Sequence, residues 1–154
     1  MHMYRTTALS DLIKPEIVND ELYSLIVELV THNELRNLIE VGASGGEGST
    51  EAIVSGLNKG LNKAAKVFSI ELSKERHLGL AKRWIEEPRL NAIHGSSIDI
   101  CDFPTIEQVT SMWIEGKTRL SNMPIGTILK WYKQDIDYMR QHGQTTSVVK
   151  QIKS

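Results

Sequence analysis

A cluster of glycines directly after a short apolar run most constrains what this chain can fold into. The stretch Leu38–Thr50 reads LIEVGASGGEGST, in which four glycines fall within seven residues. Glycine lets the backbone turn sharply and lets a ligand approach main-chain amides closely. The residues after the last glycine can open a helix, whose first turn offers unpaired N–H donors. The stretch therefore predicts a strand, a turn and a helix that together cradle a nucleotide-like small molecule.

The composition is that of a small globular protein. The 154 residues suffice for one domain with a buried core. There are 18 basic and 19 acidic side chains, so no overall field would draw the chain to nucleic acid or to an acidic membrane. A single cysteine, Cys101, excludes an intrachain disulfide, and no apolar run reaches membrane-spanning length. We expect a cytoplasmic protein with no nucleic-acid partner, no membrane partner and no metal.

Helical and strand-like segments alternate along the chain. Residues 1–15 are expected to form an N-terminal arm, and residues 16–154 a single domain with a helical segment at 104–143 after the third strand. Strands are expected at 36–41, 66–72 and 90–94, and helices at 16–30, 48–58, 73–87, 105–115 and 124–143. This order predicts an α/β fold, a Rossmann-like parallel sheet with helices on both faces in three α/β/α layers.

The carboxyl ends of the three predicted strands carry the candidate site. The glycine loop follows the first strand, Glu71 ends the second, and Ser96 and Ser97 follow the third. Ligands of open parallel sheets bind outside these ends. The loop amides would line the middle of the ligand, and the two oxygens of Glu71 could take both hydroxyls of a ribose. Ser96 and Ser97 could meet the edge of a base, with Ile98 or Leu72 against its face.

Acids near the loop favour some nucleotides over others. Glu47 and Glu51 lie where a dinucleotide would place its diphosphate, which carboxylates repel. A ligand that carries positive charge tolerates these acids, and Glu40 as well. A P-loop is excluded because Gly48 occupies the place of the lysine that would precede Ser49.

Glu40–Gly46 resembles the first motif of class I S-adenosylmethionine-dependent methyltransferases, acid-x-Gly-x-Gly-x-Gly, with Ser44 at the place of the middle glycine. Glu71 matches the acid that ends the second strand in this family and holds the adenosyl ribose. Ser96 stands where the family often has an aspartate that contacts the adenine. The resemblance covers residues 36–98 and implies a Rossmann-like domain that binds S-adenosylmethionine.

The resemblance further implies transfer of a methyl group from this cofactor to a small-molecule or other acceptor. Glu40 or its neighbours would receive the ammonium group of the ligand, and the sulfonium cation agrees with the acidic loop. The residues expected to bind the cofactor are Glu40, Gly42, Ala43, Ser44, Gly46, Gly48, Ser49, Glu71, Leu72, Ser96, Ser97 and Ile98. The available candidates for a general base are His94, Asp99, Asp102 and His142, and none is singled out.

Methyltransferases of this class have more strands than the three expected here. The sequence after Ser97 turns helical and reaches Ser154 before any clear fourth strand. We therefore expect a truncated domain, the cofactor half of a methyltransferase without the acceptor half. Such a half-sheet exposes a strand edge and apolar surface, so association with a second copy or another chain is expected.

Two other functions remain open. Gly42–Gly48 also resembles the Gly-x-x-x-Gly-x-Gly loop with which short-chain dehydrogenases bind NAD(P), although none of the four tyrosines has the lysine four residues later that completes the catalytic pair of that family. The other alternative is a non-catalytic α/β interaction module, which keeps the loop for folding and uses its long C-terminal helix for protein contacts. Titration with S-adenosylhomocysteine and with NADPH discriminates among the three.

Overall fold

The structure is a computed structural model that describes residues 17–116 and 119–152. The predicted arm at 1–15 lies outside these residues. The chain divides into two compact units, one up to Gly95 and the other from Ser96, and each is described by itself. A single domain over 16–154 therefore stays a prediction.

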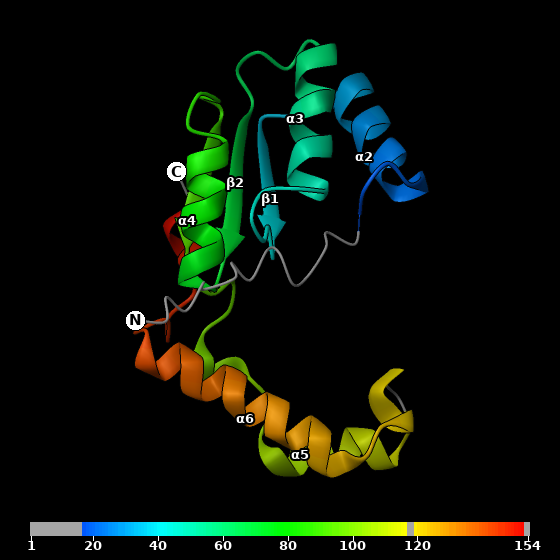
Figure 1. Ribbon diagram of the computed structural model, residues 1–154, viewed down its shortest axis with the longest axis vertical. Helices are drawn as coiled ribbons and strands as arrows, with labels where there is room; N and C mark the ends of the chain where they lie inside the picture. Colours follow the sequence, from blue (N-terminus) through cyan, green and yellow to red (C-terminus); the bar gives the residue numbers. More distant parts are fainter. Residues whose placement is uncertain (1–16, 117–118, 153–154) are drawn as a thin grey trace, which may run out of the picture. The chain divides into compact units, whose positions relative to one another are not determined.

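The first unit is an α/β unit around a parallel sheet (Figure 1). Its elements are α2 (Glu21–His32), β1 (Asn37–Val41), α3 (Ser49–Lys59), β2 (Lys66–Glu71), α4 (Lys74–Arg83) and β3 (Leu90–His94). The three predicted strands are confirmed. Helix α2 begins later than expected because the Asp20 side chain caps it by accepting a hydrogen bond from Tyr23 N–H at 2.7 Å. Helix α4 ends before the expected stop at Pro88.

The strands lie in the order β1-β2-β3, and both pairs are parallel. Glu40 of β1 is in register with Ser69 of β2, so their side chains point to the same face. Since β1 and β2 are neighbours, the loop after β1 and the end of β2 fall at the same edge of the sheet. This adjacency positions the candidate site.

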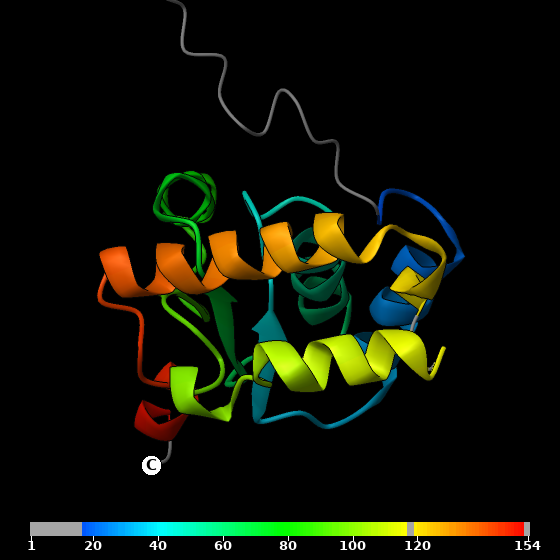
Figure 2. The same cartoon turned by 90° about the horizontal axis from the view of Figure 1, so that it is seen from below.

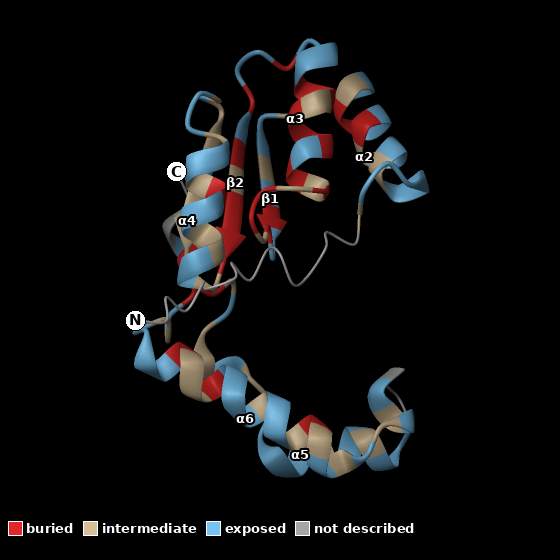
Figure 3. Ribbon diagram, viewed as in Figure 1, coloured by how far each residue is buried: buried red, intermediate tan, exposed pale blue. Residues whose placement is uncertain are grey.

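The core of the first unit lies where α2 and α3 meet one face of the sheet. Its buried members are Val30, Ile53, Leu57, Ala65 and Val67, and Figure 3 shows the buried residues of α2, α3 and β2 in red. Alternate residues of β1 differ in burial: Glu40 is buried, whereas Ile39 and Val41 are 50% and 61% exposed. One face of β1 is therefore covered and the other open, and helices on both faces stay a prediction.

The second unit is helical. Its elements are η1 (Ile100–Asp102), α5 (Ile106–Ile114), η2 (Arg119–Asn122), α6 (Ile125–Gln141) and η3 (Val148–Gln151), and α5 and α6 lie side by side (Figure 2). The end of the unit returns to its beginning, because Val148 N–H donates to the Ser96 carbonyl at 2.9 Å. Among the described residues, no helix is both long and apolar enough to cross a membrane.

Candidate ligand site at the glycine loop

The loop between β1 and α3 has an unusual backbone. Left-handed φ angles occur at Gly42 (80°), Ser44 (53°), Gly46 (84°) and Gly48 (67°). Ser44 is one of two described residues other than glycine with positive φ, and such a residue signals local strain. It is also the position at which the methyltransferase motif has a glycine. The left-handed backbone gives a physical reason for glycine there, which the sequence alone did not supply.

Glu71 joins the loop to the end of β2. Its Oε2 accepts a hydrogen bond from Ser44 N–H at 2.7 Å, and its Oε1 accepts one from Ser73 N–H at 2.8 Å. The residue is only 6% exposed. A carboxylate offers about four lone-pair positions, so two remain after these bonds. The structure thus brings together two of the three segments that the sequence placed at the site.

Glu40 lies beneath the N-terminus of α3. Its carboxylate accepts hydrogen bonds from the hydroxyls of Ser49 at 2.5 Å, Thr50 at 2.9 Å and Ser69 at 2.7 Å, and the residue is 8% exposed. The resemblance implies that Glu40 or its neighbours receive the ammonium group of a ligand, and it gives no sign of these three hydroxyls. Ser69 interrupts the apolar β2 at a position facing Glu40, and this was the available signal. The negative charge of Glu40 therefore already sits at the positive end of α3.

Glu47 forms an ion pair with Arg83 of α4. From its place in the sequence, Glu47 is expected to repel a diphosphate. Arg83 offsets part of that negative charge, so the repulsion by Glu47 is weaker than expected. Glu40 lies at the same helix end, and its described hydrogen-bond partners are hydroxyls, not cations.

Packing accounts for some of the glycines. The Trp84 indole N–H donates to the Gly46 carbonyl at 2.7 Å, and a Cβ at Gly46 would lie 2.6 Å from that indole nitrogen. A Cβ at Gly48 would lie 2.7 Å from the Ile17 carbonyl oxygen. Around Gly42, in contrast, a Cβ would meet no atom of the described residues within 4 Å. Gly42 therefore marks the part of the loop that a ligand can approach.

Ser96, Ser97 and Ile98 belong to the second unit. The Ser96 hydroxyl donates to the Ile98 carbonyl at 2.7 Å, and the Ser97 carbonyl accepts from the Ser147 hydroxyl at 2.6 Å. Leu72 is partly buried at the end of β2, and its carbonyl lies 3.0 Å from His94 Nε2. The contact of these residues with a base stays a prediction.

Asp99 is a poor candidate for a general base. The hydrogen bond from Lys150 and that from Ser147 N–H lower the pKa of Asp99 below its ordinary value. Asp99 also forms a group of possible metal ligands with Cys101 and Asp102, whose ligand atoms lie within 4.8 Å of one another. Because Lys150 already supplies the cation at Asp99, we assign no metal to this group.

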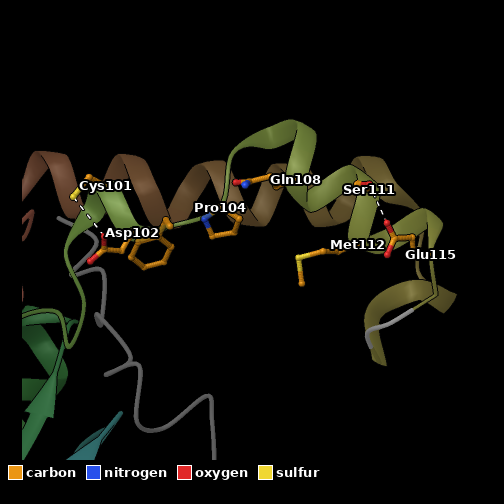
Figure 4. A pocket seen from close by; sticks show the side chains of 8 residues that line it. Cys101, Asp102, Pro104, Gln108, Ser111, Met112 and Glu115 are labelled. Carbon is orange, nitrogen blue, oxygen red and sulfur yellow. Dashed lines mark hydrogen bonds between the residues drawn. The ribbon is translucent and has the colours of Figure 1, made fainter.

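A pocket of about 540 Å³ lies along α5 in the second unit (Figure 4). Its polar groups pair with one another. Cys101 Sγ lies 3.9 Å from an Asp102 oxygen, and the Ser111 hydroxyl donates to Glu115 at 3.3 Å. These pairs leave the pocket without a converging set of free polar groups, and we assign it no ligand.

Comparison with protein-family models and with curated proteins supplies no function for this chain. No model of a protein family matches the chain, and no curated protein matches it either. The functional assignment therefore depends on the geometry of the glycine loop, Glu40 and Glu71.

Proposed function

We propose that this chain binds S-adenosylmethionine and acts as a methyltransferase-like domain. The observation that carries the proposal is the hydrogen bond from Ser44 N–H to Glu71. It joins the glycine loop after β1 to the carboxylate at the end of β2. These are the two segments that the methyltransferase resemblance assigns to the methionine portion and to the ribose of the cofactor.

Open space and a carboxylate acceptor fit this cofactor, whereas the N–H groups of Gly42 and Ala43 already donate to the Ile70 carbonyl. Gly42 leaves open space for the close approach of a ligand, and Glu71 keeps lone pairs for ribose hydroxyls. The bound cofactor would supply the methyl group on its sulfonium. The chain's own residues would hold and orient it, since alignment of donor and acceptor is the main requirement of such a displacement.

The charge at α3 favours this ligand over a dinucleotide. A diphosphate bound at a helix N-terminus is stabilised by the N–H groups and dipole of that helix. Here the buried carboxylate of Glu40 already occupies the vicinity of this end, because Ser49 and Thr50 donate to it. This carboxylate would repel the two negative charges of a diphosphate and so weaken its binding. It would not repel a sulfonium cation.

We also propose a cellular location for the protein and its association with another chain. A cytoplasmic location is consistent with the single cysteine. The exposed side chains of Ile39 and Val41 on β1 support association with a second copy or another chain, as expected for a half-sheet.

Calorimetric titration of the full chain with S-adenosylhomocysteine and with NADPH tests the proposal. We expect heat from the first ligand alone. The variant Glu71→Gln should bind S-adenosylhomocysteine about tenfold more weakly, because a charged acceptor is lost. Glu86→Gln, an exposed acid at the end of the α4 region, is the matched control and should bind as the natural chain does.

The other outcomes contradict the proposal. Heat from NADPH alone would identify a dehydrogenase-like site. Heat from neither ligand would favour the non-catalytic module. Circular dichroism of each variant shows whether a loss of binding comes from loss of the fold.

A further inference from the structure

The second unit contains a cavity that the proposed function does not use. Its volume is about 310 Å³, and it lies between α5 and α6. We call it the aromatic cavity, after the three aromatic side chains among the residues that line it. The lining residues that matter here are Trp113, Trp131, Tyr132, Ile128, Met112 and Asp135.

Two of the aromatic rings are fixed by bonds to the main chain. The Trp113 indole N–H donates to the Met123 carbonyl at 2.8 Å, and the Tyr132 hydroxyl donates to the Pro104 carbonyl. Their polar atoms are therefore satisfied within the protein. What these rings offer to the cavity is aromatic surface, which attracts cations through the negative face of the π system.

Among the described residues that line the aromatic cavity, Asp135 is the charged one. It follows Trp131 by one helical turn on α6, so the two side chains share a face of the helix. In the part of the chain that the structure describes, the Asp135 carboxylate has no hydrogen-bond or ion-pair partner. No lysine or arginine stands among the lining residues that the structure describes. The cavity thus combines aromatic walls with an exposed carboxylate at its edge.

We propose that the aromatic cavity binds a small organic cation, a quaternary or otherwise alkylated ammonium. Aromatic walls and one carboxylate are the groups that recognise such a cation. The alkyl groups fit the apolar wall better than the strongly hydrated ammonium of a lysine would. The volume is near the lower end of the range of about 300–1,000 Å³ for ligand pockets, which indicates a small molecule. This inference does not depend on the proposed function of the first unit.

Choline and its uncharged isostere 3,3-dimethyl-1-butanol provide the test with the full chain. The two molecules have nearly the same shape and differ in charge. The indole N–H signals of the three tryptophans in an NMR spectrum report where each molecule binds. We expect choline to shift the signals of Trp113 and Trp131 in a saturable way and to leave that of Trp84, in the first unit, unchanged. Choline should bind at least about fivefold more tightly than the isostere.

Substitutions locate the site. Trp131→Leu should weaken choline binding at least about fivefold and is expected to fold, since this side chain is 46% exposed. Asp135→Asn should weaken the binding of choline and leave that of the isostere unchanged. Asp137→Asn is the matched control because Asp137 lies on the same helix, does not line the cavity, and should leave both affinities unchanged.

Three results would overturn the proposal. The first is equal affinity for choline and its isostere, which would show only an apolar hole. The second is the absence of any shift of Trp113 and Trp131 at tens of millimolar choline. The third is an equal effect of Asp135→Asn and Asp137→Asn, which would show a general response to surface charge.

Discussion

Ser44 combines a left-handed backbone conformation with a hydrogen bond to Glu71. Its φ of 53° lies in the left-handed region, and its N–H points to the Glu71 carboxylate at 2.7 Å. A residue other than glycine in this region costs roughly 1–2 kcal/mol. The bond to a charged acceptor, typically about 1.5–3 kcal/mol, is large enough to offset that cost.

Substitutions at Ser44 test this balance. Ser44→Val should lower the free energy of unfolding by about 1–2 kcal/mol, because a β-branched residue resists positive φ. Ser44→Gly should stay within about 1 kcal/mol of the natural chain, since relief of strain opposes the larger entropy of the unfolded state. Urea denaturation measures both. A valine variant as stable as the glycine variant would contradict a left-handed backbone conformation at residue 44.

Glu40→Gln tests the buried carboxylate. An amide has one acceptor oxygen, so it cannot serve the three hydroxyls that Glu40 serves. We expect the free energy of unfolding to fall by about 1–3 kcal/mol. Glu34→Gln, at an exposed position before β1, is the control and should change stability by less than about 0.5 kcal/mol. Equal effects of the two substitutions would argue against the buried network.

The sequence predicted part of this site. The glycine loop could be predicted because its glycines lie close together in the sequence. Glu71 could be predicted because it lies at the end of an apolar, strand-like run. The hydrogen bonds of Glu40 with Ser69 and of Gly46 with Trp84 were not found, because they join residues that are distant along the chain. Only the order of the strands and the packing of α4 bring those residues together.

At the scale of the elements, Arg89 ties the start of β3 to the end of α3. Its guanidinium donates to the Leu57 carbonyl at 3.2 Å and to the Asn58 side chain at 2.5 Å. It also forms an ion pair with Glu87 at 2.6 Å. The hydrogen bond from Arg89 lowers the pKa of Glu87, against the smaller opposing effect of burial.

This pKa shift predicts a pH dependence. Because the pKa of Glu87 is lower in the folded protein, its stabilising contribution is complete above the unfolded-state pKa of about 4.3 and is lost as the pH falls through the folded-state pKa. Glu87→Gln should therefore lose less stability than the natural chain between pH 6 and pH 3, roughly the window around that pKa. Urea denaturation at a series of pH values measures this. Parallel curves for the two proteins would contradict the ion pair.

Thr105 begins α5 with a capping box. Its hydroxyl accepts from Gln108 N–H at 3.3 Å, and the Gln108 side chain accepts from Thr105 N–H at 2.7 Å. Thr105→Ala should lower the stability of the second unit by about 0.5–2 kcal/mol. Thr110→Ala, on the same helix, should change it little, because the Thr110 hydroxyl bonds back to the Ile106 carbonyl within the helix. The indole signal of Trp113 during urea denaturation reports this unit. An equal loss in the two variants would contradict the cap.

Element positions were more predictable than element ends. The apolar runs of β1, β2 and β3 identified all three strands. Apolar spacing predicts an earlier start of α2 than the cap at Asp20 allows, and α4 ends at Arg83 although apolar residues continue to Ile85. In these helices, hydrophobic spacing indicated the presence of the element but not its boundary.

At the scale of the whole molecule, the chain divides at Gly95 and Ser96 into two compact units, and the single domain expected from the sequence stays a prediction. The strand order β1-β2-β3 makes the glycine loop and Glu71 neighbours. A division between units depends on how many contacts cross a chain position. That property is set by tertiary packing and leaves no local pattern near Ser96.

The central claim is that the loop after β1 and the carboxylate of Glu71 form one site for the methyl donor. An NMR titration of the full chain with S-adenosylhomocysteine tests it most directly through the backbone amides of Gly42 and Ser44. The account predicts a saturable shift of both signals, no shift with NADPH, and a large loss of affinity in Glu71→Gln but not in Glu86→Gln. Amide signals of Gly42 and Ser44 that stay in place at saturating ligand would contradict it.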